Sequence, residues 1–167
     1  PGISICVGSK DKILWAEGFG FADLENKTRV TVNSKFRMGS VSKLLTTQAI
    51  GLLYQEGKWD LDVPIQRYLP DFPEKKYPIT SRQLAGHTAG IRHYRNSDPL
   101  SIPKRYKSVR EGLSIFKDDS LLFKPGTAYA YSTFGYCLLS AVAEVVSHTE
   151  FLFFMRDSIF LRLGMTN

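Results

Sequence analysis

Two side chains near the end of the first quarter of the chain have the types and spacing needed for nucleophilic catalysis. Ser40 and Lys43 are three residues apart in a stretch with helical periodicity, so both should lie on one face of its first turn. A serine hydroxyl attacks a carbonyl only after a base has taken its proton. A lysine amine can be this base when it is neutral, and both the positive end of a helix dipole and burial favour the neutral amine. The pair therefore indicates acyl transfer, with the Ser40 backbone amide as an oxyanion donor.

Tyr131 is the third candidate catalytic residue. It lies in a short extended segment before a long predicted helix, from which its hydroxyl could relay a proton to a leaving group. Each candidate also has a purely structural interpretation. Ser40 is an ordinary helix N-cap, and Tyr131 could belong to an aromatic cluster with Tyr129, Phe134 and Tyr136. Only the catalytic interpretation requires the three functional groups to meet at one point.

The elements that must position these residues follow an α+β order, with extended segments first and helices afterwards. Residues 3–7 and 13–21 alternate apolar and small side chains around a turn at 8–12, which predicts a hairpin. The polar segment 23–29 is predicted to be a loop.

Helical patterns dominate the rest of the chain. Apolar spacing predicts a helix with Ser40 as N-cap and Gly57 as its end. Capping-box patterns that begin at Thr80 and at Ser108 predict two further helix starts. A continuous apolar face predicts a long helix after Tyr131. The predicted helices span residues 40–56, 80–90, 108–116, 134–146 and 150–161.

The composition is that of a folded globular segment. Apolar residues make up 43% of the 167 and charged residues 23%, which excludes a disordered tail, a collagen or a coiled coil. No apolar run is long enough to cross a bilayer. The net charge of +6 comes without a dense basic block, and the richest stretch, Lys104–Arg110, is interpreted as a solvated loop. We therefore expect no nucleic-acid partner and no membrane span.

The cysteines and histidines do not have the pattern of a metal centre. Cys6 and Cys137 lie among apolar residues and are predicted to be buried free thiols rather than a disulfide. His87, His93 and His148 lack the spacing of a zinc site and are interpreted as hydrogen-bonded structural side chains. No metal or organic cofactor is predicted.

Three ordered motifs resemble the serine β-lactamase and penicillin-binding-protein superfamily, and in particular its class C-like serine hydrolases. They are Ser40–Lys43, Leu84–Ile91 and Pro125–Tyr136. Within that branch, three segments are similar to a mitochondrial group of β-lactamase-like proteins that form filaments, namely 68–75, 90–94, and 123–126 with 131–136. The resemblance covers nearly the whole chain and implies the N-terminal part of a β-lactamase/transpeptidase-like fold.

The resemblance also implies a role for each candidate residue. Ser40 would be the acylated nucleophile, Lys43 its activating base, and Tyr131 the general acid and base. Thr133 departs from the usual pattern, because most members have an asparagine there, whose amide can both donate and accept. The third motif of the branch, a Lys- or His-Thr-Gly strand, is expected beyond residue 167.

We therefore predict that residues 1–167 form a single partial β-lactamase-related domain whose C-terminal strands and third motif are missing from this stretch. The predicted function is a serine hydrolase that acts on a peptide, amide or ester, of the mitochondrial protease type. One alternative is a bacterial penicillin-binding-type peptidase or esterase, periplasmic or secreted. The other is a filament-forming structural protein with a secondary active site, for which a homo-oligomer or filament is expected.

Overall fold

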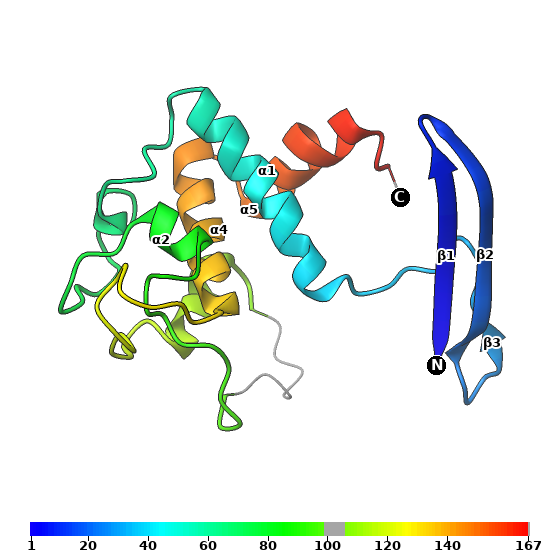
Figure 1. The fold of residues 1–167 in the computed structure, drawn as a ribbon, viewed down its shortest axis with the longest axis horizontal. Coiled ribbons are helices and arrows are strands. Elements are labelled where there is room, and N and C mark those ends of the chain that lie inside the picture. Colours follow the sequence, from blue (N-terminus) through cyan, green and yellow to red (C-terminus); the bar gives the residue numbers. More distant parts are fainter. Residues whose placement is uncertain (99–105, 167) are drawn as a thin grey trace. The chain divides into compact units, whose positions relative to one another are not determined.

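The computed structural model describes residues 1–98 and 106–166, and it divides the chain into two compact units (Figure 1). The unit Pro1–Gly39 is a three-stranded sheet, and the unit Ser40–Asn167 is helical. The α+β order predicted from the sequence is confirmed.

The sheet is a twelve-residue strand with a neighbour on each side. β1 (Gly2–Ser9) pairs antiparallel with β2 (Lys12–Asp23), which pairs in turn with β3 (Thr28–Arg29). Lys10 adopts a left-handed φ of 52° in the turn that joins β1 to β2. The predicted hairpin is confirmed, whereas the end of the predicted loop 23–29 is a short strand.

Cys6 shows that apolar neighbours alone do not predict burial. It is exposed in β1, so the prediction of a buried thiol is wrong for this residue, although both cysteines are free, as predicted. Its neighbours Ile5 and Val7 are themselves 37% and 47% exposed. Alternation along a strand creates an inside only where a second layer covers one face, and within Pro1–Gly39 no helix or second sheet covers β1.

The core of the helical unit is built around α4 (Thr133–Ser147). Nine of its residues are buried, from Phe134 to Val146, because apolar and small side chains occupy more than one of its faces. It packs against α1 (Ser42–Gln55), with which it lies side by side in Figure 1. Three shorter helices also pack on it, namely α2 (Ser81–Ala85), α3 (Val109–Gly112) and α5 (Phe151–Phe154).

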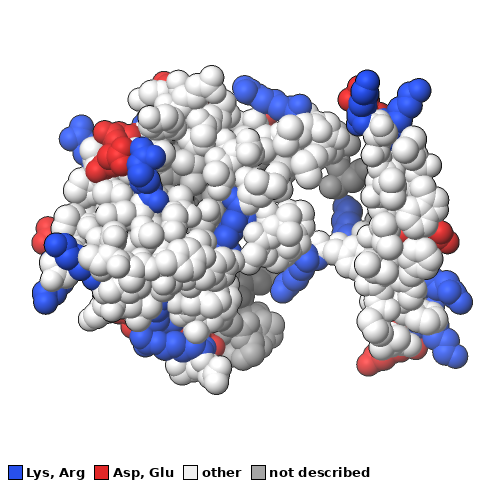
Figure 2. Space-filling view, in the orientation of Figure 1, with Lys and Arg blue, Asp and Glu red and all other residues white. Residues whose placement is uncertain are grey.

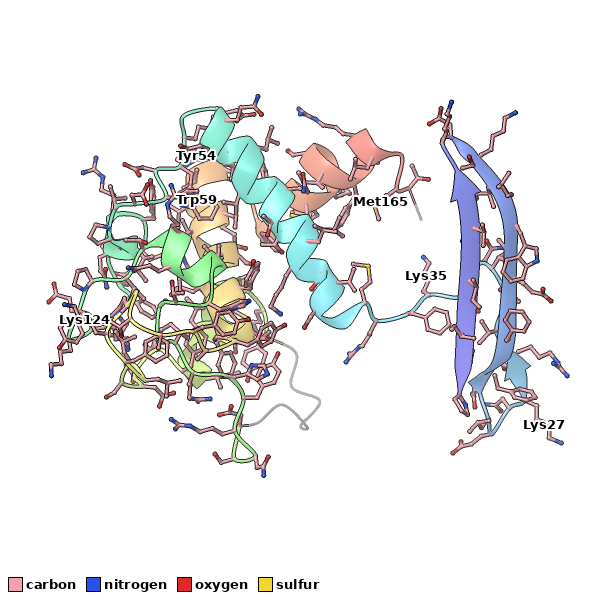
Figure 3. The ribbon with its side chains drawn as sticks, in the orientation of Figure 1. Lys27, Lys35, Tyr54, Trp59, Lys124 and Met165 are labelled. Carbon is pink, nitrogen blue, oxygen red and sulfur yellow. The ribbon has the colours of Figure 1, made fainter. Side chains whose placement is uncertain are left out.

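A buried hydrogen bond ties α2 to the turn that follows α1. Trp59, labelled in Figure 3, is 1% exposed, and its Nε1 donates to the Ser81 hydroxyl at 2.9 Å. The predicted capping box at Thr80 is confirmed, since its hydroxyl accepts from the Gln83 amide and the Gln83 side chain accepts from the Thr80 amide. These local bonds fix the start of α2, which leads to His87.

The first predicted helix begins later than expected. Residues Gly39–Val41 form a 3₁₀ turn, and α1 begins at Ser42. The prediction that Ser40 is an N-cap is wrong, because its hydroxyl bonds to side chains and no side-chain hydrogen bond caps α1. The predicted end is confirmed, with Gly57 at a left-handed φ of 67° directly after the helix.

The other predicted helices are confirmed, and α4 matches the predicted span 134–146 within one residue at each end, but the remaining ones end differently. α2 stops at Ala85 rather than near residue 90, because His87 adopts a left-handed φ of 59°. Ser108 caps α3 as predicted, and a 3₁₀ turn (Leu113–Ile115) completes that segment. The helix predicted over 150–161 is confirmed as an unbroken helical segment over 151–163. Its hydrogen bonds change type along its length, from α5 to a π-helical turn (Met155–Phe160) and a 3₁₀ turn (Leu161–Leu163).

Basic side chains are spread over the surface. On the face in Figure 2, Lys and Arg of the helical unit form several separate groups, some of them next to Asp or Glu. Residues 104 and 105 of the predicted basic loop lie outside the described residues, and Lys107 and Arg110 are exposed. Among the described helices, none is by itself long and apolar enough for a membrane span, although α4 and residues 151–163, bent by 77°, meet that test as a pair.

Candidate active site

Ser40, Lys43 and Tyr131 meet at one point in the helical unit. The Tyr131 hydroxyl donates to Ser40 Oγ at 2.6 Å, and Lys43 Nζ donates to the same oxygen at 3.3 Å. Tyr131 is 91 residues from Ser40 in sequence, so this contact depends on the tertiary fold. The structure therefore brings together all three candidate catalytic residues predicted from the sequence.

Lys43 Nζ lies among hydroxyls and aromatic rings. It donates to Thr133 Oγ1 at 3.2 Å, and it lies 4.9 Å from the centre of the Tyr131 ring and 5.4 Å from that of Tyr136. Both rings present their electron-rich face to this nitrogen. Thr133 thus provides an acceptor for Lys43 at the position where the sequence departs from the usual asparagine.

Tyr131 has the electrostatic surroundings of a proton carrier. Hydrogen bonding to Lys43, and next to Ser40, lowers the pKa of its phenol below the ordinary tyrosine value. The residue is 37% exposed, so an incoming molecule can reach it. A tyrosine whose pKa moves toward neutrality is better matched to proton transfer under physiological conditions.

Two helix starts position the candidate catalytic side chains. Lys43 lies in the first turn of α1, and the preceding 3₁₀ turn, entered at Gly39 with φ 54°, carries Ser40. On the other side, the Ser132 hydroxyl accepts from the Gly135 amide at 3.1 Å and donates to the Arg92 carbonyl at 2.7 Å. Ser132 is therefore the N-cap of α4, and Tyr131 directly precedes it.

The comparison with known families agrees with this arrangement of motifs and elements. The family described as Beta-lactamase matches residues 1–167, which is the whole chain. This chain belongs to the Beta-lactamase family.

Individual proteins are also similar to the chain over nearly its whole length. It is 33% identical to the human serine beta-lactamase-like protein LACTB, mitochondrial, over 233 aligned positions that cover 99% of this chain and 42% of that protein. The octameric penicillin-binding protein homologue of Pyrococcus abyssi superimposes with a TM-score of 0.86 and 26% identity, covering 99% of this chain and 40% of the other. The D-amino acid amidase of Ochrobactrum anthropi SV3 superimposes with a TM-score of 0.84 and 28% identity, covering 99% and 46%. The chain thus spans less than half the length of each.

A buried arginine network supports the tyrosine segment of this Beta-lactamase family chain, and the sequence did not reveal it. Arg92 is 6% exposed and donates to the carboxylates of Asp98 at 2.7 Å and Asp119 at 2.6 Å. Its guanidinium lies 5.0 Å from the centre of the Phe134 ring. The pairing raises the pKa of Arg92 and lowers that of Asp98. Its only sequence signal was the resemblance of segment 90–94, because a buried arginine has no local pattern.

Breaking this network should cost much of the stability of the helical unit. We expect Arg92→Leu to lower the free energy of unfolding by about 3–5 kcal/mol, because Asp98 would remain as a buried charge without its partner. Denaturant unfolding of the full-length protein measures the change. Arg82→Leu is the matched control, since its bidentate pair with Asp62 is exposed and should contribute little. Equal losses in the two variants would contradict the role of Arg92.

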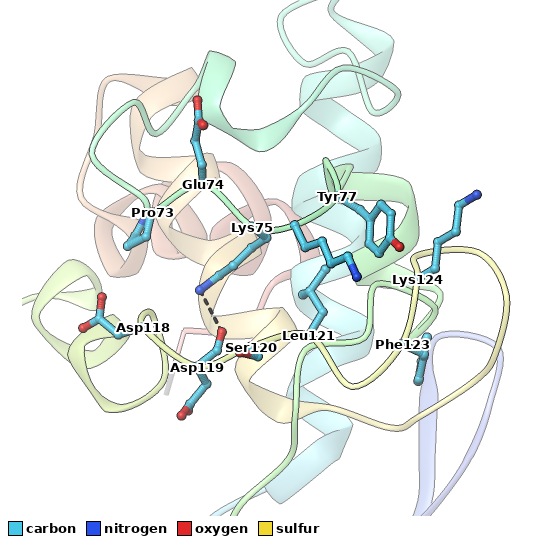
Figure 4. A pocket seen from close by; sticks show the side chains of 11 residues that line it. Pro73, Glu74, Lys75, Tyr77, Asp118, Asp119, Ser120, Leu121, Phe123 and Lys124 are labelled. Atoms are coloured by element: carbon cyan, nitrogen blue, oxygen red, sulfur yellow. Dashed lines mark hydrogen bonds between the residues drawn. The ribbon is translucent and has the colours of Figure 1, made fainter.

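A separate pocket of about 480 Å³ lies between the loops 73–77 and 118–124 (Figure 4). The Lys75 side chain crosses this pocket. Its Nζ donates to the backbone oxygen of Lys117 and, at 2.9 Å, to that of Asp119. Burial lowers the pKa of the Lys75 amine, while Asp118 and Asp119 act in the opposite direction. Lys75 thus links the two loops, and none of the three candidate catalytic residues lines this pocket.

Proposed function

We propose that this chain carries the nucleophile, the activating lysine and the tyrosine of a serine hydrolase that works through an acyl-enzyme at Ser40. The observation that supports it most directly is the pair of contacts on one oxygen, 2.6 Å from the Tyr131 hydroxyl and 3.3 Å from Lys43 Nζ. An N-cap serine or a tyrosine in an aromatic cluster does not require such a contact.

The proposed reaction has two steps. In the first, Ser40 gives its proton to the neutral Lys43 amine or to the Tyr131 phenolate, and its Oγ forms a bond to the substrate carbonyl carbon. The bond to the leaving group breaks, and the leaving group takes up that proton. In the second, water attacks the ester, the acid product leaves, and the proton returns to the Ser40 oxygen.

Amides, peptides and esters are the substrate class that this chemistry favours. One structural neighbour is a D-amino acid amidase and another a penicillin-binding protein homologue, which supports amide and peptide carbonyls in particular. The mitochondrial relative supports a mitochondrial peptidase, and we propose that compartment. The penicillin-binding homologues support the alternative of a bacterial peptidase or esterase.

A fluorophosphonate probe tests the nucleophile directly. We expect the probe to modify the full-length protein at Ser40 when the adduct is located by peptide mass spectrometry, because the Ser40 hydroxyl contacts both the Lys43 amine and the Tyr131 phenol. Modification of a different serine would refute the proposal.

The same measurement separates the enzyme from a structural protein. The octameric state of the Pyrococcus abyssi neighbour supports self-association as a second candidate property. If the full-length protein assembles into oligomers or filaments while Ser40 stays unmodified, the structural function is favoured. Modified Ser40 in an assembled protein would support both properties together.

A further inference from the structure

His87 holds the backbone on both sides of Tyr131. Its carbonyl oxygen accepts the Ala130 amide at 3.0 Å, and its ring nitrogen Nδ1 accepts the Ser132 amide at 3.2 Å. The centres of the His87 and Tyr131 rings are 4.5 Å apart. One residue therefore fixes the main chain before and after Tyr131 and also contacts its ring.

The hydrogen bond to Ser132 determines where the His87 ring carries its proton. A backbone amide can only donate, so Nδ1 must accept, and the proton of the neutral ring lies on Nε2. A proton on Nδ1 would place two donors, Nδ1–H and the Ser132 amide, opposite each other. The Ser132 amide would then lose its hydrogen-bond acceptor, although Ser132 is only 3% exposed.

His93 repeats the arrangement one residue further along. Its Nδ1 accepts the Thr133 amide at 3.3 Å, and its ring meets the edge of the Tyr131 ring at 5.4 Å. Thr133 is the first residue of α4, and the backbone amides of a helix's first turn have no partner within the helix. The two histidines thus hold consecutive amides of the Tyr-Ser-Thr segment.

The groups that face His87 oppose its protonation. Burial lowers the pKa of its imidazole, and the nearby Lys43 of α1 and the His93 ring lower it further. The other titratable groups around it are the phenols of Tyr129, Tyr131 and Tyr136, at ring distances of 5.8, 4.5 and 5.5 Å. Since its folded pKa is depressed, the stability that His87 contributes is complete above about pH 6.5, the ordinary histidine value, and is lost as the pH falls through the folded pKa.

We propose that neutral His87 is the positioning residue that holds Tyr131 on the Ser40 hydroxyl, and that acid releases this hold. The inference rests on the proposed function for its effect on rate, but its structural part is independent of catalysis. The change would leave Ser40 in its 3₁₀ turn and Lys43 in α1 while it frees the tyrosine segment.

Two substitutions separate the acceptor from the rest of the ring. In His87→Asn the amide oxygen takes the place of Nδ1, does not titrate, and tolerates the left-handed φ of 59°. In His87→Gln the amide lies one carbon further out and misses that place. His148→Asn is the matched control, because His148 is an exposed histidine with φ 53° at the end of α4.

We expect the rate of fluorophosphonate modification of the wild-type full-length protein to fall by about 10- to 100-fold as the pH drops through the His87 titration. His87→Asn should keep the neutral-pH rate and lose this step, whereas His87→Gln should already be about 10- to 100-fold slower than wild type at neutral pH. His148→Asn should behave as wild type. A His87→Asn profile that keeps the wild-type acid dependence would overturn the proposal.

Two measurements decide the inference even if Ser40 is never modified. Nitrogen-15 NMR of the imidazole should show His87 Nδ1 unprotonated at neutral pH. Hydrogen exchange at the Ser132 amide should be faster in His87→Gln than in His87→Asn. A protonated Nδ1, or equal exchange in the two variants, would refute the positioning role. An unmodified Ser40 with both expected results would refute only the proposed function.

Discussion

Ser40→Ala should abolish hydrolysis of a chromogenic ester by the full-length protein. Removal of the nucleophile from a serine hydrolase leaves only the contribution of binding and oxyanion stabilisation, so we expect the rate to fall roughly 10⁴- to 10⁶-fold. Alanine removes the oxygen that receives both the Tyr131 and the Lys43 hydrogen bonds, and no other described hydroxyl occupies that point. Initial rates of ester cleavage measure the loss.

A loss of ester hydrolysis in Ser40→Ala must be distinguished from unfolding of the variant and from effects of removing any exposed serine hydroxyl. Ser40 is exposed, so its truncation should leave the unfolding transition nearly unchanged. Ser114→Ala is the control, because Ser114 is an exposed serine whose hydroxyl donates to the Glu111 carbonyl outside the site. Ester cleavage that survives in Ser40→Ala at the wild-type rate would place the nucleophile elsewhere.

Tyr131→Phe should have the second large kinetic effect. The substitution keeps the ring against His87 and removes the hydroxyl that lies 2.6 Å from Ser40 Oγ. Loss of a positioned general acid and base costs about 10²- to 10⁴-fold in rate. We expect a loss in that range for the acylation of Ser40, measured as the rate of fluorophosphonate modification.

Tyr129→Phe provides the matched comparison for this effect. Tyr129 precedes Tyr131 by two residues, is 67% exposed, and also presents its ring to His87, at 5.8 Å. Tyr129→Phe also removes a phenol oxygen. If its modification rate stays near that of wild type, the effect at Tyr131 comes from the position of that hydroxyl beside Ser40. Equal rates for the two variants would remove Tyr131 from the proposed mechanism.

The sequence by itself determined features that depend on neighbours within about one turn. The Ser40–Lys43 spacing, the capping box at Thr80, the Ser108 cap and the hairpin turn all rest on contacts between residues two to four apart. Such contacts are favoured by local geometry wherever the segment lies, so pattern and chemistry suffice to predict them. The motif resemblance then gave roles to Ser40, Lys43 and Tyr131.

Only the tertiary structure decided the features that join distant segments. Ser40 is not a helix cap, because its hydroxyl accepts a hydrogen bond from Tyr131, which is 91 residues away in the sequence. Arg92 is buried because Asp98 and Asp119 converge on it, and Cys6 is exposed because no layer covers its strand within Pro1–Gly39. The acceptor role of His87 likewise depends on an amide 45 residues away. Burial and long-range pairing follow from the path of the whole chain, which no local pattern encodes.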